Sequence, residues 1–85
     1  MRRREEERLG GVLRELASLL LDEGAELAVE TIQIGKKTTF LIRSSCPGAL
    51  LGRNGSTISA LRTVVGKVGA RLRTETSVEV DEFQA

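Results

Sequence analysis

Two glycines three residues apart, Gly52 and Gly55, separate a short apolar segment from a long helical pattern, and they constrain the fold most. Neither glycine carries a Cβ, so the backbone can turn tightly there and let a ligand come close. The helix that begins near Ser56 points its free N–H groups and positive dipole end at this loop. Such a helix end suits a phosphate, and Arg53 adds a positive charge. We therefore expect the loop to hold an anion.

Apolar residues at helical spacing predict two long helices. The first stripe begins at Leu9 and ends at Leu20, and the charged residues 1–8 extend its helix. The segment Asp22-Glu23-Gly24 stops this helix, with Gly24 as a left-handed cap. The second helix runs from Ser56 to about Leu72. Its stripe consists of Ile58, Leu61, Val65, Val68 and Leu72.

Period-two patterns predict three strands. Residues Ala25–Ile34 alternate but change phase, which a bulge near Glu30-Thr31 would explain. A turn at Gly35–Lys37 joins this strand to a second one at Thr38–Ser44, so the two form a hairpin. The last strand is expected at about Glu75–Asp81.

A short helix at Pro47–Leu51 precedes the glycine loop, with Ser45 or Cys46 available as its cap. The predicted order is therefore αββααβ. Three strands with helices packed on one face give an α+β fold. We expect residues 1–85 to form a single domain, with a core at about 9–82.

The composition argues against catalysis. The chain of 85 residues has no histidine, which removes the usual general base and the commonest metal ligand, and its one cysteine, Cys46, cannot form an internal disulfide. We expect no enzymatic activity, no metal site and no cofactor. No apolar run approaches the roughly 20 residues of a membrane helix, and no secretory signal is evident, so we expect a cytoplasmic protein without a membrane partner.

Charge is distributed unevenly along the chain although the net charge is only +1. No acidic residue occurs between Gly35 and Arg73, whereas acids gather on either side of that segment. A basic middle predicts one positive face, with an ordinary solvated surface as the alternative. The basic residues of this segment are Lys36, Lys37, Arg43, Arg53, Arg62, Lys67, Arg71 and Arg73.

Two simpler interpretations of the glycine loop fit the sequence poorly. Asn54-Gly55 is a favoured hairpin turn, but a hairpin needs strands on both sides and a helix follows here. A nucleotide-binding P-loop requires Gly-Lys-Ser/Thr after the loop and a strand immediately before it, and both are missing.

Taken with its surroundings, the loop resembles that of a KH domain of the prokaryotic type II. The resemblance rests on three runs and extends over nearly the whole chain, with the small stand-alone bacterial KhpA family as the closest likeness. The runs are Ile42-Arg43-Ser44-Ser45, Pro47 to Ile58 and Ala60-Leu61-Arg62-Thr63-Val64-Val65. The resemblance implies a KH fold that binds single-stranded RNA, with about four nucleotides held by the Gly-x-x-Gly loop and an adjacent groove.

Carried onto this chain, the resemblance places the sugar-phosphate backbone at the loop, and Leu50 or Leu51 in the groove floor. Core packing is the simpler role for the leucines, and a solvated surface position is equally compatible with Arg43 and Arg62. The candidate RNA-binding residues are Gly52, Arg53, Asn54, Gly55, Ser56, Arg43, Arg62 and Leu50.

The loop carries one basic residue, Arg53, where KH proteins of this kind often carry two. We therefore expect weak, salt-sensitive binding that is strengthened by a homodimer or by a heterodimer with another KH-domain protein. The function predicted is that of a bacterial post-transcriptional regulator or RNA chaperone. The alternative is a KH fold that serves as a protein-interaction or ribosome-associated module with weak RNA affinity.

Overall fold

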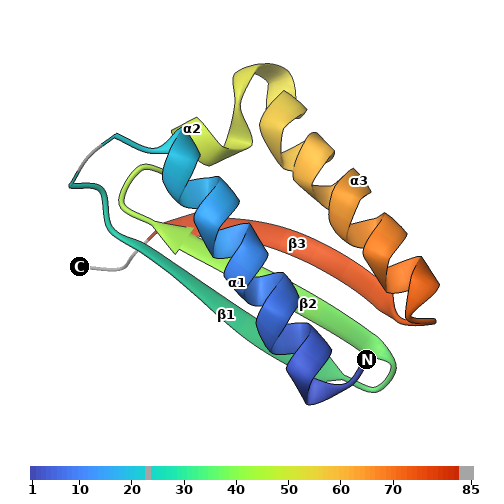
Figure 1. Ribbon diagram of the computed structural model, residues 1–85. Helices are drawn as coiled ribbons and strands as arrows, with labels where there is room; N and C mark the ends of the chain where they lie inside the picture. Colours follow the sequence, from blue (N-terminus) through green and yellow to red (C-terminus); the bar gives the residue numbers. More distant parts are fainter. Residues whose placement is uncertain (23, 83–85) are drawn as a thin grey trace.

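Three strands form one mixed sheet in the computed structural model, which describes residues 1–22 and 24–82 (Figure 1). The central strand, β2, is antiparallel to β1 and parallel to β3. A parallel pair needs a crossover connection, and the helical segment between β2 and β3 supplies it. The strands are β1 (Leu27–Ile34), β2 (Lys37–Ser44) and β3 (Glu75–Glu82).

The helices lie together on one face of this sheet (Figure 1). Cys46 is the N-cap residue of α2, without a side-chain hydrogen bond, and Pro47 occupies the first turn, where its missing N–H is no loss. The order αββααβ and the α+β class are those that the sequence predicts. The helices are α1 (Arg3–Leu20), α2 (Pro47–Leu51) and α3 (Ser56–Arg71), with a 3-10 turn, η1 (Arg53–Gly55), between the last two.

The hydrophobic core lies between the helices and the inner face of the sheet. Phe40 and Ile42 of β2 are fully buried, and they cluster with Leu13 of α1, Leu50 of α2 and Val65 of α3. Each such side chain stabilises the fold by about 1.5–3 kcal/mol through its removal from water. Because β2 supplies the centre of this core, the segment that follows it is held firmly in place.

The bulge predicted near Glu30-Thr31 is wrong, because β1 and β2 pair in one continuous register. The change of phase has another cause. Val29 lies opposite the buried Ile42 and faces the helices, whereas Ile32 and Ile34 lie on the outer face of the sheet, which no helix of the described residues covers. Ile34 is 75% exposed, so the second half of β1 has apolar residues on the solvent side.

The end of α1 also differs from the prediction. The helix stops at Leu20, and Leu21 is already extended at φ −103° and ψ 152°. Gly24 does adopt a positive φ of 91°, but it lies in the connection to β1 and does not cap the helix. Glu23, which belongs to the predicted stop signal, lies outside the described residues. Within the described part of the chain, no helix is long and apolar enough to cross a membrane.

The directions of the elements give the molecule two distinct ends. β2 and β3 both run toward α2 and the glycine loop, and we call this the loop end. The opposite end carries the Gly35-Lys36 turn, and we call it the turn end. α1 and α3 run antiparallel, because Leu16 and Leu20 lie near Thr57, while Leu9 lies near Leu72. The N-terminus of α1 and the C-terminus of α3 are therefore both at the turn end.

Candidate nucleic-acid interface

Gly52 ends α2 in a conformation that only glycine adopts readily. Its φ of 75° and ψ of 176° lie in a region that is essentially closed to residues with a Cβ. Space is also lacking, because a Cβ on Gly52 would lie 2.8 Å from the backbone nitrogen of Thr57 and would overlap its side chain. The chain therefore passes directly over the start of α3, and only glycine permits this.

The other end of the loop makes a second unusual turn. Asn54 (φ 56°, ψ 27°) and Gly55 (φ 74°, ψ 15°) are consecutive left-handed residues, and asparagine is among the few residue types that tolerate this region. The Gly55 N–H donates to the Gly52 carbonyl oxygen at 3.3 Å, so the turn is closed by its own backbone. The loop is thus built from backbone geometry rather than from side-chain contacts.

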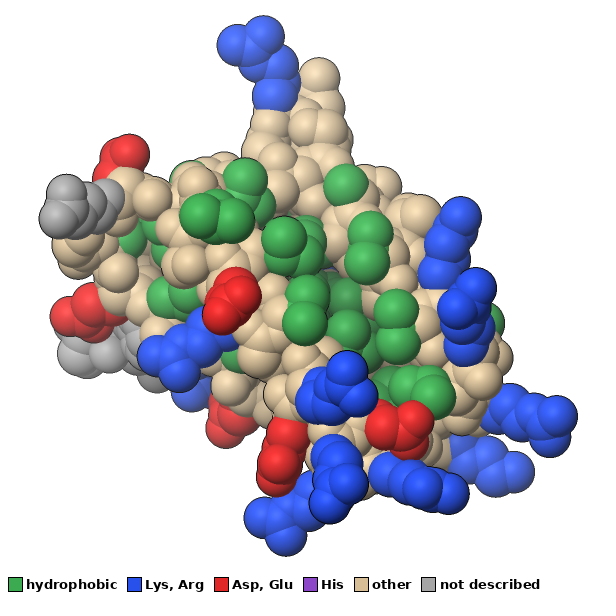
Figure 2. Space-filling view, viewed as in Figure 1, with side chains coloured by type: hydrophobic (Ala, Val, Ile, Leu, Met, Phe, Trp, Pro, Cys, Tyr) green, Lys and Arg blue, Asp and Glu red, His purple; other side chains and the backbone are tan. Residues whose placement is uncertain are grey.

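Donors and one positive charge gather at the tip of the loop. No side-chain oxygen caps the N-terminus of α3, so N–H groups of its first turn keep their positive partial charge for an external partner. Arg53, Asn54 and Ser56 are all exposed. Arg53 makes no ion pair with any residue that the structure describes. Figure 2 shows a basic side chain projecting at the top of the view, where Figure 1 places the loop.

Arg43 does not join this group. It lies on the outer face of the sheet, opposite the helices, and its Nη2 is 3.5 Å from Oε2 of Glu30 on the neighbouring strand. Both side chains are about half exposed, so the pair is only weakly stabilising. The structure therefore places Arg43 on a different face from the glycine loop.

Arg62 bridges α3 and the edge strand β3. Its Nε donates a hydrogen bond to the Val78 carbonyl oxygen at 3.0 Å, and its Nη2 lies 3.6 Å from Oε2 of Glu79. Much of its charge is therefore balanced within the protein. Of the three arginines predicted to meet RNA, Arg53 alone lies at the loop tip.

The two leucines of α2 have different positions. Leu50 is fully buried in the core, whereas Leu51 is 41% exposed. Leu50 therefore supports the loop from below, and Leu51 is the leucine that an approaching ligand can touch.

The basic middle of the sequence does not form one positive face. β2 and α3 each run the length of the domain, so the basic residues along this segment are distributed between its two ends. Lys36, Lys37 and Arg71 lie at the turn end, and Arg53 lies at the loop end. The loop end instead receives acidic residues from the end of β3 and from the segment before β1. These are Asp22, Glu26, Glu79, Asp81 and Glu82.

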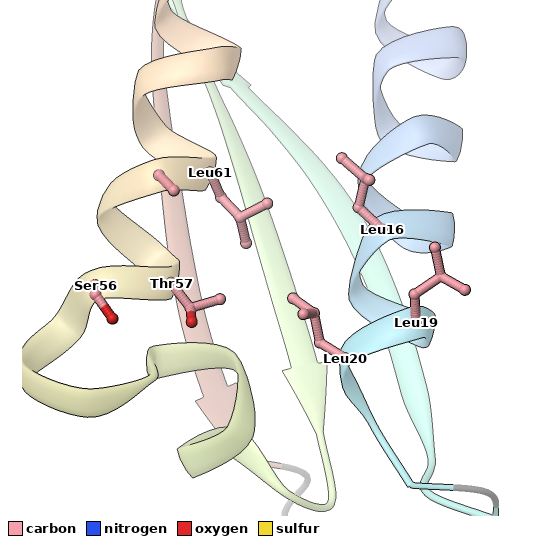
Figure 3. Close-up of a pocket in the computed structure, with 7 residues that line it drawn as sticks. Leu16, Leu19, Leu20, Ser56, Thr57 and Leu61 are labelled. Carbon is pink, nitrogen blue, oxygen red and sulfur yellow. The ribbon is translucent and has the colours of Figure 1, made fainter.

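An apolar groove of about 400 Å³ lies beside the loop, between the end of α1 and the start of α3 (Figure 3). Leu20 and Leu61 point toward each other across it, and Thr57 lies at its loop side. Leu19 of α1 is 81% exposed. Figure 2 shows apolar side chains in a band between the two helices.

The sequence predicted α1 from its apolar stripe but did not identify this groove. Two apolar residues recur in almost every turn of the stripe, which makes it wider than a single face of the sheet can cover. Leu9 and Leu13 are buried, but Val12, Leu16 and Leu20 remain between 38% and 51% exposed. The doubled stripe was the signal that could have identified the exposed surface.

Comparison with known protein families identifies a match over most of the chain. A family model described as "KhpA/KhpB, KH domain" matches residues 11–81, which is most of the chain and includes the whole glycine loop. A search of curated proteins found no match.

Proposed function

Because this chain belongs to the KhpA/KhpB family of KH domains, whose members are non-catalytic RNA-binding modules, we propose that it binds single-stranded RNA through its Gly52–Gly55 loop. In this proposal the loop holds the sugar-phosphate backbone of about four nucleotides. Arg53 supplies the charge, Asn54 and Ser56 supply polar groups, and the start of α3 supplies N–H donors. The protein itself performs no chemistry on the RNA.

One observation carries this proposal. At Gly52 the structure lacks both the space and the backbone freedom for a side chain, although the position is at the surface of a small domain. The restriction is set by Thr57 of the same chain, which folds the loop tightly over the start of α3. The missing Cβ also lets another backbone come close to the loop, and this supports the proposal.

Base contacts are expected from apolar and backbone groups instead of aromatic stacking. Phe40 is fully buried, and no other aromatic residue occurs in the described part of the chain. Leu51 offers an exposed apolar surface next to the loop. Without stacking platforms or a second loop cation, we expect low affinity and little preference for base sequence.

The exposed apolar band between α1 and α3 supports a second part of the proposal, which is association with another KH domain. Leu19 of α1 is 81% exposed and lines the groove with Leu16 and Leu20. On the facing helix, Val64 is 50% exposed and lies further along the band, beside Val12 and Val68. Joining two loops in one particle raises the affinity for a continuous RNA strand through effective concentration. We propose a homodimer as the simplest occupant of this face.

A role in bacterial RNA regulation or RNA chaperoning fits a weak, non-specific binder of this kind. One observation favours the alternative, a protein-interaction or ribosome-associated module. The loop end carries several exposed acids, including Asp81 and Glu82, which repel a polyanion.

The decisive experiment replaces Arg53 and Asn54 with aspartate and titrates the variant with labelled single-stranded RNA at low salt. Aspartate tolerates the left-handed backbone of position 54, so the fold should survive, and circular dichroism checks this. We expect binding to fall at least tenfold. Arg14→Asp, which changes the charge by about two units against about three for the loop variant, lies at an exposed position of α1. It is the control and should bind nearly as well as the wild type.

Equal binding by the loop variant and the wild type would exclude the loop as the RNA site. A wild-type protein that binds no RNA would favour the interaction-module alternative instead.

The association is tested by sedimentation equilibrium. Leu19→Glu with Val64→Glu should give a monomer, whereas Ile34→Glu introduces one charge at a similarly exposed apolar position on the sheet and should leave the dimer intact. A wild-type protein that remains monomeric at micromolar concentration would contradict the homodimer.

A further inference from the structure

The turn end concentrates positive charge from three separate parts of the chain. When each helix and strand is divided at its midpoint, nine basic side chains fall at the turn end with four acidic ones. The described residues of the loop end hold four basic and seven acidic side chains. The nine are Arg2, Arg3, Arg4 and Arg8 from α1 and its cap, Lys36 and Lys37 from the hairpin turn, and Lys67, Arg71 and Arg73 from α3 and the turn after it.

These charges are available to a partner. Among the described residues, Arg3 alone of the nine is in an ion pair, with Glu7 at 3.3 Å, and that pair is itself highly exposed. All nine residues are exposed at the surface. Figure 2 shows basic side chains projecting from the lower and right-hand parts of the view, where Figure 1 places the N-terminus and the end of α3.

Helix stability does not account for the whole cluster. Positive charges favour a helix C-terminus, which suits Arg71, but Arg2, Arg3 and Arg4 lie at the positive end of the α1 dipole, where cations are unfavourable. Arg73 has a further cost, because its φ of 55° is left-handed at a helix end where glycine or asparagine is usual. Two separate features at the same end therefore oppose stability, and both supply positive charge.

We propose that the turn end is a second contact surface for the RNA backbone, used by strands that extend beyond the glycine loop. α3 connects the two places directly, from the loop at Ser56 to the basic residues Lys67 and Arg71. This inference rests on the proposed RNA binding at the loop. The loop determines where the strand is seated, and the turn end supplies most of the electrostatic attraction.

The dimensions fix the length of RNA that this requires. The sixteen residues of α3 span about 24 Å at 1.5 Å per residue. At a stacked spacing of about 3.4 Å per nucleotide, that distance corresponds to roughly seven nucleotides. Added to about four nucleotides held at the loop, the full path needs about 11 nucleotides, which an RNA of about 12 nucleotides covers.

The test compares a 5-nucleotide and a 12-nucleotide RNA of the same composition. The wild type should bind the longer RNA more tightly, with a steeper dependence on salt. If three phosphates meet the turn end, the advantage of the longer RNA should fall about 20-fold between 50 mM and 200 mM salt, from a slope of about −0.7 per phosphate.

The turn-end variant combines Lys67→Gln, Arg71→Gln and Arg73→Asn. Asparagine accepts the left-handed conformation, so folding should be retained, and thermal unfolding checks this. The variant should lose most of the advantage of the 12-nucleotide RNA and bind the 5-nucleotide RNA like the wild type. The single change Arg71→Gln should act in the same direction, whereas Arg14→Gln, also an exposed helical arginine, should change the length dependence little.

The outcomes separate the two proposals. If the variant keeps the full advantage of the longer RNA, the turn end is not an RNA contact, while binding at the loop stands. If the wild type binds neither RNA, the proposed function fails and this inference fails with it. A variant that weakens both RNAs equally would also overturn the inference, since the turn end would then act only as a general charge.

Discussion

The loop end and the turn end of this domain offer opposite properties to a nucleic acid. The loop end has a shaped backbone, with a glycine at position 52 where a side chain is disfavoured by both backbone conformation and space. Acids outnumber cations among its described residues, and of those cations only Arg14 and Arg53 are outside an ion pair. The turn end has a dense set of exposed cations but no comparable cradle. The loop end therefore offers a shaped backbone with little positive charge, and the turn end offers much positive charge without a shaped backbone.

If RNA contacts both ends as proposed, this domain places most of its electrostatic attraction and its positioning in different residues. A backbone cradle must fit closely, and this limits how many long charged side chains can surround it. A charged surface acts over about 10 Å at moderate salt and needs no exact fit. Separating the two properties allows each to be altered by mutation on its own.

Gly52→Ala should have the largest effect and removes the geometry of the loop end. The forbidden backbone conformation and the overlap with Thr57 together should cost about 2–4 kcal/mol of unfolding free energy. RNA binding should fall even at temperatures where the variant is folded. Chemical denaturation and RNA titration measure the two effects. Gly66→Ala, in an open position of α3, should instead gain up to about 1 kcal/mol.

Gly69→Ala tests a glycine at the turn end that we expect to matter for the stability of the fold and not for RNA binding. A Cβ there would lie 2.8 Å from the Thr74 carbonyl oxygen, at the point where α3 turns into β3. The expected loss is about 1–3 kcal/mol of stability from overpacking. At a temperature where the variant is folded, its affinity for a 5-nucleotide RNA should equal that of the wild type. A selective loss of that affinity would show that the two ends are not independent.

Neutralising two acids at the loop end should have a smaller effect, which is a rise in RNA affinity. In Asp81→Asn with Glu82→Gln, two repulsive charges are removed, each worth roughly 0.4 kcal/mol at a distance of about 10 Å in water. RNA affinity at low salt should therefore rise about fourfold, as fluorescence anisotropy can measure. The gain should shrink as salt is added, and an unchanged affinity would show that the strand does not pass near the end of β3.

Arg73→Asn should give the smallest effect, and it should raise stability, whereas Gly52→Ala and Gly69→Ala lower it. Relief of the left-handed strain, partly offset by the loss of a favourable charge at the end of α3, should raise stability by about 0.5 kcal/mol. For a domain of this size that is roughly 2–4 °C in Tm. Differential scanning calorimetry measures it. A lower Tm would mean that the arginine is kept for stability rather than for binding.

Local patterns predicted most of the fold. The steps from Ile58 to Leu72 indicated α3, and the glycine pair indicated the turn before it, because helix period and backbone freedom are properties of neighbouring residues. The bulge in β1 was wrong because alternation was assumed to follow one buried face. In an edge strand that is only partly covered, apolar residues such as Ile32 and Ile34 also occur on the open face.

The candidate site was less accessible to prediction, because charge on a surface depends on the path of the chain. A sequence without acids between Gly35 and Arg73 suggested one positive face, yet the parallel crossover carries those residues to opposite ends. Arg62 similarly meets β3 only because α3 packs beside that strand. Such pairings depend on tertiary contacts that no local pattern contains.

The charge separation between the two ends has a consequence for kinetics. A domain that is positive at one end and negative at the other is oriented by the field of a polyanion before it makes contact, so its first encounter with RNA should occur through the turn end. The association rate then depends on Arg71 and its neighbours, while the lifetime of the complex depends on the fit at Gly52. In the proposed complex, the residues that make the first contact with RNA and the residues that hold it lie at opposite ends of α3.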